Sequence, residues 1–274
     1  MSIIQRFKNG LYTASKSFNL VMNNKKLLLY LGVPILAGSL IEILAYNTSM
    51  GRLSLGMSFS PKETIVRLLK GTATQNWFLF ISILGIYFLY LAIVTFQSIA
   101  LTHHTTILSK GANIGLFKNI KACTPKLKKS LVWSTFVLIP IITFYMLKTY
   151  MYTLDKGILQ SSYLFIIFFL FVSWSLITSY VIQVTTIEEV SILQAIKISF
   201  YAIKKTLFEY LGNMFWLCLI AFLSIIPFII LEQYIKTVYY LPAILLLSCF
   251  ISTTYTISKT LLYQHFKKQE IKNK

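Results

Sequence analysis

The sequence predicts an all-α fold: a polytopic membrane helical bundle of about six transmembrane helices, arranged as three hairpins with cytoplasmic interfacial amphipathic helices. Composition is the first reason, since 56% of the 274 residues are hydrophobic and 12% are charged, whereas about 25% are charged in soluble domains. The second is that long apolar runs follow one another too closely to leave a soluble domain between them. We therefore expect one integral membrane domain over residues 1–274, with an amphipathic cytoplasmic segment at 1–26, spans within 27–258 and a basic cytoplasmic tail at 259–274.

Six apolar runs are long enough to cross a membrane, because about twenty helical residues cover a hydrocarbon core roughly 30 Å thick. The third and fifth runs are the shortest, and Lys129 and Lys148 flank the third, from where their side chains can reach the interfaces. The unbroken runs also exclude a barrel, whose strands would alternate apolar and polar residues. The expected spans are 27–46, 77–100, 131–147, 163–184, 214–231 and 239–258.

The distribution of basic residues predicts the orientation. Of the 26 Lys and Arg residues, 19 lie in the two terminal segments and in the loops after the second and fourth spans. The other 7 lie in the loops after the first, third and fifth spans. The positive-inside rule places the richer side in the cytoplasm, so we expect both termini there. Since 4 of the 7 fall in the loop 47–76, the alternative is an odd number of spans that omits the third or the fifth.

The net charge of +18 is compatible with binding to nucleic acid or to anionic lipid. The basic residues lie just outside apolar runs and do not form a separate basic domain with stacking aromatic residues. We therefore expect contact with the lipid bilayer and its anionic headgroups, and no nucleic acid. Protein partners and oligomeric state do not follow from the sequence.

An amphipathic stretch, a Lys-Lys pair and a span with a proline occur in this order three times. The periodicity of each stretch is helical, although the second is short and broken. The expected apolar faces are Ile4, Phe7, Leu11, Ala14, Phe18 and Met22 in the first copy, Ile114, Phe117 and Ile120 in the second, and Ile192, Ile196, Phe200, Ile203 and Leu207 in the third.

We interpret these stretches as helices in the cytoplasmic interface, where attraction to anionic lipid contributes roughly 1 kcal/mol per basic residue. The tail has a similar apolar face at Leu262 and Phe266. A three-fold internal repeat is one hypothesis, and the alternative is that Lys pairs only mark span ends. Thr186 and Glu189 have capping-box spacing for the start of the third helix. Ser60 and Pro61 predict a short helix on the outer side.

Glu42 is the acidic residue placed well inside a predicted span, where an ionised carboxylate costs at least about 2.5 kcal/mol. A Glu42 side chain that faces the inside of the bundle would predict a role in proton or cation binding. Because Glu42 lies near the outer end of its span, its carboxylate can instead reach the lipid headgroups, and we favour this interpretation. Pro34, Pro140 and Pro227 bend their helices and could expose carbonyl groups to ions. A kink that aids packing is the commoner role of such prolines.

No catalytic constellation is visible. His103 and His104 are adjacent, and on a helix their side chains diverge by about 100°, so they do not readily share a metal ion. The sequence lacks a nucleophile elbow, a P-loop, an HExxH motif and a Gly-rich dinucleotide turn. We expect no catalytic residue, no metal and no cofactor.

Residues 174–189, 195–199 and 205–213 resemble an uncharacterised family of bacterial six-span membrane proteins, a domain of unknown function, and residues 17–34 are similar to the start of that family. A more distant similarity exists to the membrane domain of some glycerophosphodiester phosphodiesterases, although this chain has no catalytic barrel. The resemblance implies a location in the bacterial inner membrane and carries over no catalytic residue. The Lys-rich second cytoplasmic loop and the basic tail depart from the family.

The leading functional hypothesis is a non-catalytic integral membrane protein whose cytoplasmic helices contact anionic lipid or partner proteins. The alternative is a small permease or transport component that uses the proline-kinked spans and Glu42. A lipid-modifying membrane enzyme is the third hypothesis, and it would require polar groups that converge at the level of the headgroups.

Overall fold

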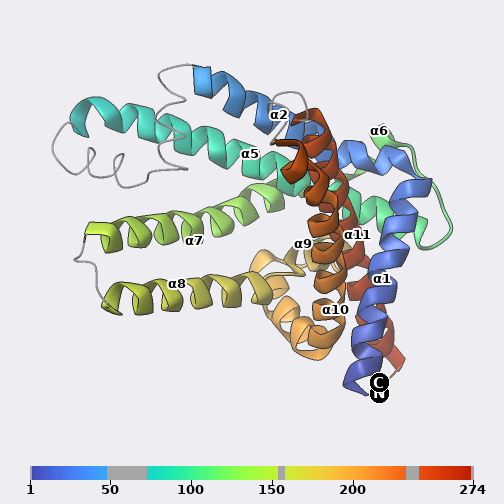
Figure 1. Ribbon diagram of the computed structural model, residues 1–274. Coiled ribbons are helices and arrows are strands. Elements are labelled where there is room, and N and C mark those ends of the chain that lie inside the picture. The colour runs from blue at the N-terminus through green and yellow to red at the C-terminus, as the bar shows by residue number, and fades with distance from the viewer. Residues whose placement is uncertain (1, 48–72, 154–157, 233–240, 273–274) are drawn as a thin grey trace. The chain divides into compact units, whose positions relative to one another are not determined.

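The computed structural model describes residues 2–47, 73–153, 158–232 and 241–272. Within this part of the chain every regular element is a helix, which confirms the all-α prediction. The helix predicted at Ser60 and Pro61 lies outside the described residues. The elements (Figure 1) are α1 (Ile3–Asn23), the short 3₁₀ helix η1 (Lys25–Leu27), α2 (Leu28–Asn47), α5 (Ala73–Leu108), α6 (Leu116–Cys123), the 3₁₀ helix η2 (Thr124–Lys126), α7 (Leu127–Thr153), α8 (Ile158–Ile177), α9 (Val181–Ile187), α10 (Ile192–Glu232) and α11 (Leu241–Lys272).

Four stretches among the described residues are long and apolar enough to cross a membrane: Leu84–Leu108, Phe169–Ile187, Ile192–Pro227 and Pro242–Lys272. Between 22% and 39% of the most apolar window of each is buried inside the protein, so most of these side chains face outward and require an apolar surrounding. The chain is therefore a multi-pass membrane protein. The first and third predicted spans are helical in α2 and α7, and a total of six spans stays a prediction.

The chain divides into two compact units. The first comprises Met1–Leu36, Val94–Lys129 and Leu176–Lys274, and the second comprises Ala37–Ile93 and Ser130–Ser175. In the first unit a hydrophobic core joins the end of α1 to parts of α2, α5, α6 and α11, and its buried members are Val21, Leu27, Tyr30, Leu31, Ala100, Leu101, Cys123 and Ile257.

Small side chains bring helices together in the second unit. The Ser130 hydroxyl of α7 donates a hydrogen bond of 2.6 Å to the carbonyl of Ala92 in α5. Gly38 of α2 lies so close to α5 that an added Cβ would be 2.6 Å from the Tyr90 ring. Close approach through glycine and serine is a common way for helices to associate in membranes, where no hydrophobic effect drives helices together.

Each predicted amphipathic stretch contains a helix that is followed by a break in helical geometry, although Ile114 of the second stretch precedes α6. η1 separates α1 from α2, and η2 separates α6 from α7. In α10 the break is a kink at Thr206, with φ −113° and ψ 19°, so the third predicted interfacial helix and the fifth predicted span form one bent helix. The Lys-Lys pairs lie at or beside these breaks: Lys25 and Lys26 in η1, Lys128 and Lys129 just after η2, and Lys204 and Lys205 just before Thr206.

The predicted start of the third amphipathic helix is wrong. Thr186 belongs to α9, and Glu189 has a positive φ of 57° in the turn that follows. Ser191 caps α10 instead: the Gln194 amide donates to the Ser191 hydroxyl at 3.4 Å, and the Ser191 amide donates to the Gln194 side chain at 3.3 Å. Thr186 with Glu189 and Ser191 with Gln194 have the same capping-box spacing. The helix begins after the second pair, five residues later than predicted.

The fourth predicted span, 163–184, is divided between α8 and α9. Ser199 of α10 compensates for the interruption. Its hydroxyl donates to the Ile177 carbonyl at 2.6 Å and accepts from the Tyr180 amide at 3.0 Å, so backbone groups at the break keep partners in an apolar setting. The sixth predicted span and the basic tail, by contrast, form one continuous helix, α11.

Helix α1 packs lengthwise on α10 and α11 (Figure 1). Its buried face consists of Gly10, Ala14, Ser17 and Val21. Of these four residues, the predicted apolar face contains only Ala14. A Cβ on Gly10 would lie 2.0 Å from the Glu209 carbonyl oxygen, and one on Gly212 would lie 2.3 Å from the Phe7 carbonyl oxygen. Glycine is thus required on both helices at this crossing.

Gly10→Ala should therefore separate α1 from α10 and destabilise the protein by about 1–3 kcal/mol, as overpacking does. Gly85→Ala is the matched control, because Gly85 also lies in a helix but has no atom within 4 Å of an added Cβ, and alanine favours the helix. Thermal unfolding in detergent followed by circular dichroism compares them. A Gly10→Ala protein that unfolds at the same temperature as Gly85→Ala would contradict the close crossing.

Candidate functional site

The residues singled out from the sequence lie in different environments. Pro34 is buried in α2, Pro140 is half-buried in α7 and Pro227 is exposed in α10, so the three prolines do not share one kind of site. Glu42 lies in α2, and its side chain is outside the described residues. A proton or cation role for Glu42 stays a prediction.

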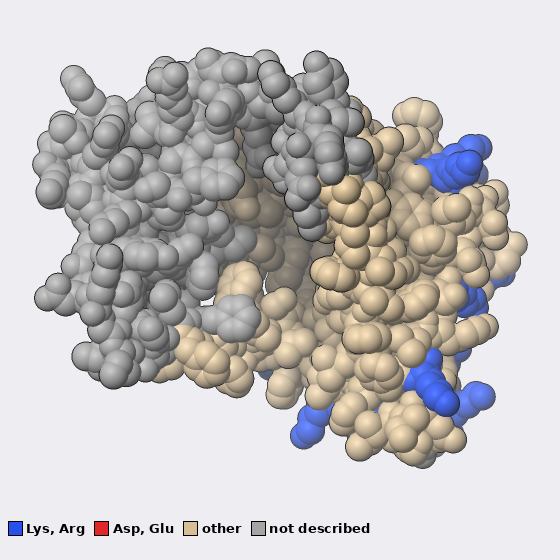
Figure 2. All heavy atoms as spheres, in the orientation of Figure 1, with Lys and Arg blue, Asp and Glu red and all other residues tan. Residues whose placement is uncertain are grey.

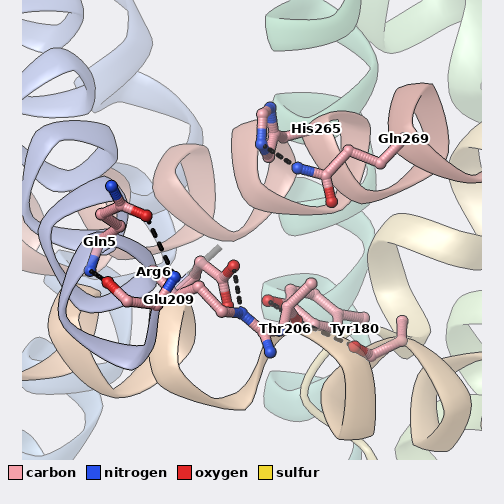
Figure 3. A network of polar contacts seen from close by, with 9 residues as sticks. Gln5, Arg6, Tyr180, Thr206, Glu209, His265 and Gln269 are labelled. Carbon is pink, nitrogen blue, oxygen red and sulfur yellow. Dashed lines mark hydrogen bonds and ion pairs between the residues drawn. The ribbon is translucent and has the colours of Figure 1, made fainter.

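An ion pair lies at the crossing of α1 and α10 (Figure 3). Arg6 Nε donates to Glu209 Oε1 at 2.9 Å, and this hydrogen bond raises the pKa of the Arg6 guanidinium above its usual value. Glu209 is 4% exposed, and its second carboxylate oxygen has no hydrogen-bond partner among the described residues. One turn further along α10, Asn213 accepts a hydrogen bond from Ser258 of α11. Polar contacts thus connect α10 with α1 on one side and α11 on the other.

A second group of charges joins segments far apart in the sequence. Glu188 accepts a hydrogen bond from the Tyr263 hydroxyl and lies 3.3 Å from Lys267 Nζ, both in α11. Glu189 lies 3.2 Å from Lys126 Nζ of η2, and the Glu189 carbonyl accepts from Lys129 Nζ at 2.8 Å. The adjacent glutamates therefore hold the end of η2 and the C-terminal part of α11 against the turn between α9 and α10.

His103 and His104 have separate partners, as their divergence on a helix predicts. His104 Nδ1 lies 2.9 Å from the Tyr30 hydroxyl, and His103 Nδ1 lies 2.6 Å from Asn119 Oδ1. The Asn119 amide also donates to the Tyr30 hydroxyl and to the Ala100 carbonyl, each at 2.8 Å. Both imidazoles thus take part in a buried hydrogen-bond network that fixes α6 on α2 and α5.

A buried tyrosine network surrounds the kink of α10. The Tyr180 hydroxyl lies 3.2 Å from Thr206 Oγ1, at the kink itself (Figure 3). The Tyr210 hydroxyl accepts from Ser179 at 3.1 Å and lies 2.9 Å from the Tyr255 hydroxyl. These hydroxyl groups bond to one another inside the unit, so the arrangement stabilises the bend and the α8–α9 break.

The described residues do not gather the ligands that most metal sites use. No cluster of three or more His, Cys, Asp and Glu residues that could hold a metal is found among them. Burial raises the pKa of the Cys123 thiol, which lowers the fraction of reactive thiolate. In the first unit these polar groups connect helices.

Outward-facing charge in the first unit is strongly basic. Glu188, Glu189 and Glu209 each pair with a basic side chain, which neutralises much of the negative charge there. On the face shown in Figure 2 the charged side chains visible among the described residues are Lys and Arg. The exposed lysines of the first unit are Lys8, Lys16, Lys25, Lys26, Lys110, Lys118, Lys121, Lys128, Lys197, Lys204, Lys205, Lys268 and Lys272.

Large apolar side chains are exposed next to these lysines. Phe117 of α6 is 86% exposed and precedes Lys118. Tyr12 of α1 is 70% exposed, one turn from Lys8 and Lys16. Phe117 belongs to the apolar face predicted from the sequence, whereas Tyr12 lies outside the predicted face of α1. The signal for Tyr12 is its spacing of four residues from a lysine on either side. Apolar and basic groups side by side are what the membrane interface accommodates.

Comparisons with known protein families, curated proteins and solved structures found no match to this chain. The resemblance to a bacterial six-span family therefore stays a prediction from the residues alone.

Replacing Arg6 with glutamine should leave the buried Glu209 carboxylate without its cation. Loss of one partner of a fully buried pair costs about 3–5 kcal/mol; because the Arg6 side chain is 28% exposed, we expect about 1–3 kcal/mol. The double variant Arg6→Gln with Glu209→Gln should recover part of this loss, and Lys8→Gln, on an exposed lysine, should cost little. Unfolding temperatures of the four proteins test the pair. Equal stability of Arg6→Gln and Lys8→Gln would contradict it.

Proposed function

We propose that this protein is a non-catalytic integral membrane protein of six spans whose basic helices bind anionic lipid headgroups at the cytoplasmic face of a bacterial inner membrane. The observation that carries the proposal is the surplus of exposed lysines in the first unit, beside exposed apolar side chains and with three glutamates already paired. Among the described residues no group of three or more His, Cys, Asp and Glu side chains could hold a metal ion.

The energetics favour lipid as the partner of these lysines. Each basic residue near an anionic surface contributes about 1 kcal/mol, and apolar burial adds to it. Exposed Phe117 and Tyr12 supply apolar area next to such lysines, and tyrosine prefers the level of the headgroups. A folded soluble partner would cover these groups less well, since a large surplus of one charge is depleted from the core of protein interfaces.

The proposed orientation rests on the distribution of charge along the chain. Of the 26 Lys and Arg residues, 19 lie on the side that carries both termini in a six-span topology. The exposed lysines of the first unit, including those of α1, α6 and the end of α11, belong to this group. The anionic leaflet that attracts polybasic segments is the cytoplasmic one, so topology and binding point to the same face.

Reconstitution into vesicles of phosphatidylcholine with phosphatidylglycerol tests this function. Electron spin resonance with spin-labelled phosphatidylglycerol should show a larger motionally restricted fraction than spin-labelled phosphatidylcholine, by roughly fivefold in relative affinity if one lysine acts at each site. The preference should fall in 1 M salt, because screening shortens the range of exposed charges. Equal restriction of the two lipids at low salt would contradict the proposal and favour a protein as the partner.

A further inference from the structure

Helix α1 and the first half of α10 have the same helix start. Ser2 and Gln5 form a capping box in α1, with hydrogen bonds of 3.3 Å and 3.0 Å. Ser191 and Gln194 form the same box in α10, at 3.4 Å and 3.3 Å. Both boxes have the sequence Ser-Ile-x-Gln, so each residue of α1 can be compared with the residue 189 positions later.

The packed faces of the two helices correspond position by position. The buried residues Gly10, Ala14 and Ser17 of α1 correspond to the buried residues Ser199, Ile203 and Thr206 of α10. The Ser17 hydroxyl donates to the carbonyl four residues earlier at 2.7 Å, and Thr206 makes the corresponding bond at 2.9 Å. The next pair, Val21 and Tyr210, is buried as well. The two helices therefore have the same phase from Gly10 and Ser199 onward, whereas in the first turn Ile192 is buried and its counterpart Ile3 is exposed.

The opposite faces of the two helices carry the same three residue types. Lys8, Tyr12 and Lys16 of α1 are all exposed, and so are their counterparts at 197, 201 and 205. Four-residue spacing places each triplet on one helix face. Tyr12 is two residues from buried Ala14, or about 200° around the helix, so the triplet points away from the packed face. The counterpart Tyr201, which is 46% exposed, has the same relation to buried Ile203, and its ring also packs against Phe266 of α11 with 6.0 Å between the ring centres.

The electrostatic setting of both triplets suits an anion. Neither α1 nor the stretch 192–208 of α10 contains Asp or Glu, and none of the four lysines forms an ion pair with a described residue. Lys205 Nζ lies 5.7 Å from the centre of the Tyr201 ring, so this amine already leans toward the tyrosine. A lysine one turn on either side of a tyrosine is about 6 Å away along the helix axis, close enough for both amines to reach one group above the ring.

We propose that the triplets Lys8–Tyr12–Lys16 and Lys197–Tyr201–Lys205 are two equivalent binding sites for the phosphate of an anionic phospholipid. This inference rests on the proposed function and names the residues that perform it. In each site the two ammonium groups bind the phosphate, the tyrosine hydroxyl donates to it or to the adjoining headgroup, and the ring lies at the interface. The region of helix α6 lacks the motif. Four residues before Phe117, at the position of the first lysine, the sequence has Asn113.

The test compares variants of the full-length protein in the same vesicles and by the same spin-label measurement. Lys8→Gln with Lys16→Gln removes one site, Lys197→Gln with Lys205→Gln removes the other, and a quadruple variant removes both. The matched control replaces four other exposed lysines by glutamine, at Lys25, Lys26, Lys118 and Lys121, so that the net charge changes equally. Circular dichroism and unfolding temperature confirm that each variant is folded, as expected for exposed positions.

The two double variants should each weaken the phosphatidylglycerol preference, to a similar extent, and the quadruple variant should lose it by at least roughly fivefold. The control, whose lysines belong to the same basic surface but to neither triplet, should weaken the preference by a smaller factor than the quadruple variant does. If the wild type prefers phosphatidylglycerol but the quadruple variant and the control lose it equally, or neither loses it, the two sites are overturned while the proposed function stands. If the wild type shows no preference, both proposals fail.

Discussion

The close crossing of α1 and α10 is the constraint on which the rest of the first unit depends. Carbonyl groups of Phe7 and Glu209 occupy the space that side chains at Gly212 and Gly10 would need, so the two backbones meet with almost no freedom to slide. Arg6 and Glu209 close the same contact with opposite charges. Once the small face of α1 is fixed inward, helical geometry leaves Lys8, Tyr12 and Lys16 on the outside.

Breaks in helices are stabilised by side chains from elsewhere in the chain. Ser199 satisfies the backbone at the α8–α9 interruption, and Tyr180 reaches Thr206 at the bend of α10. Because unsatisfied backbone groups are costly in an apolar medium, such breaks persist only where a partner is provided. Glu188 then brings the end of α11 to the same region, so the polar residues of this unit hold irregular segments together and leave the lysines to face outward.

Apolar periodicity was sufficient to predict the helices, because about twenty consecutive apolar residues admit few other structures in a membrane protein. It was insufficient for their ends: Thr186 with Glu189 and Ser191 with Gln194 both have capping-box spacing, and the hydrogen bonds of the box form at Ser191 and Gln194. Pairing of Arg6 with Glu209 joins residues 203 positions apart, a relation that one sequence does not contain. The packed face of α1 was missed because Gly10 and Ser17 have little hydrophobicity, although small residues are what close helix contacts in membranes require.

We infer that α1 and the first half of α10 turn matched lysine–tyrosine faces to the cytoplasm while their opposite faces pack inward. Single cysteines at Tyr12, Tyr201, Ala14 and Ser161, in a protein otherwise free of cysteine, test it directly with a membrane-impermeant thiol reagent on cells. We expect labelling of Ser161→Cys in intact cells, labelling of Tyr12→Cys and Tyr201→Cys only after permeabilisation, and slow labelling of Ala14→Cys in both conditions. Labelling of Tyr12→Cys or Tyr201→Cys in intact cells, or of Ala14→Cys as fast as Tyr12→Cys, would contradict it.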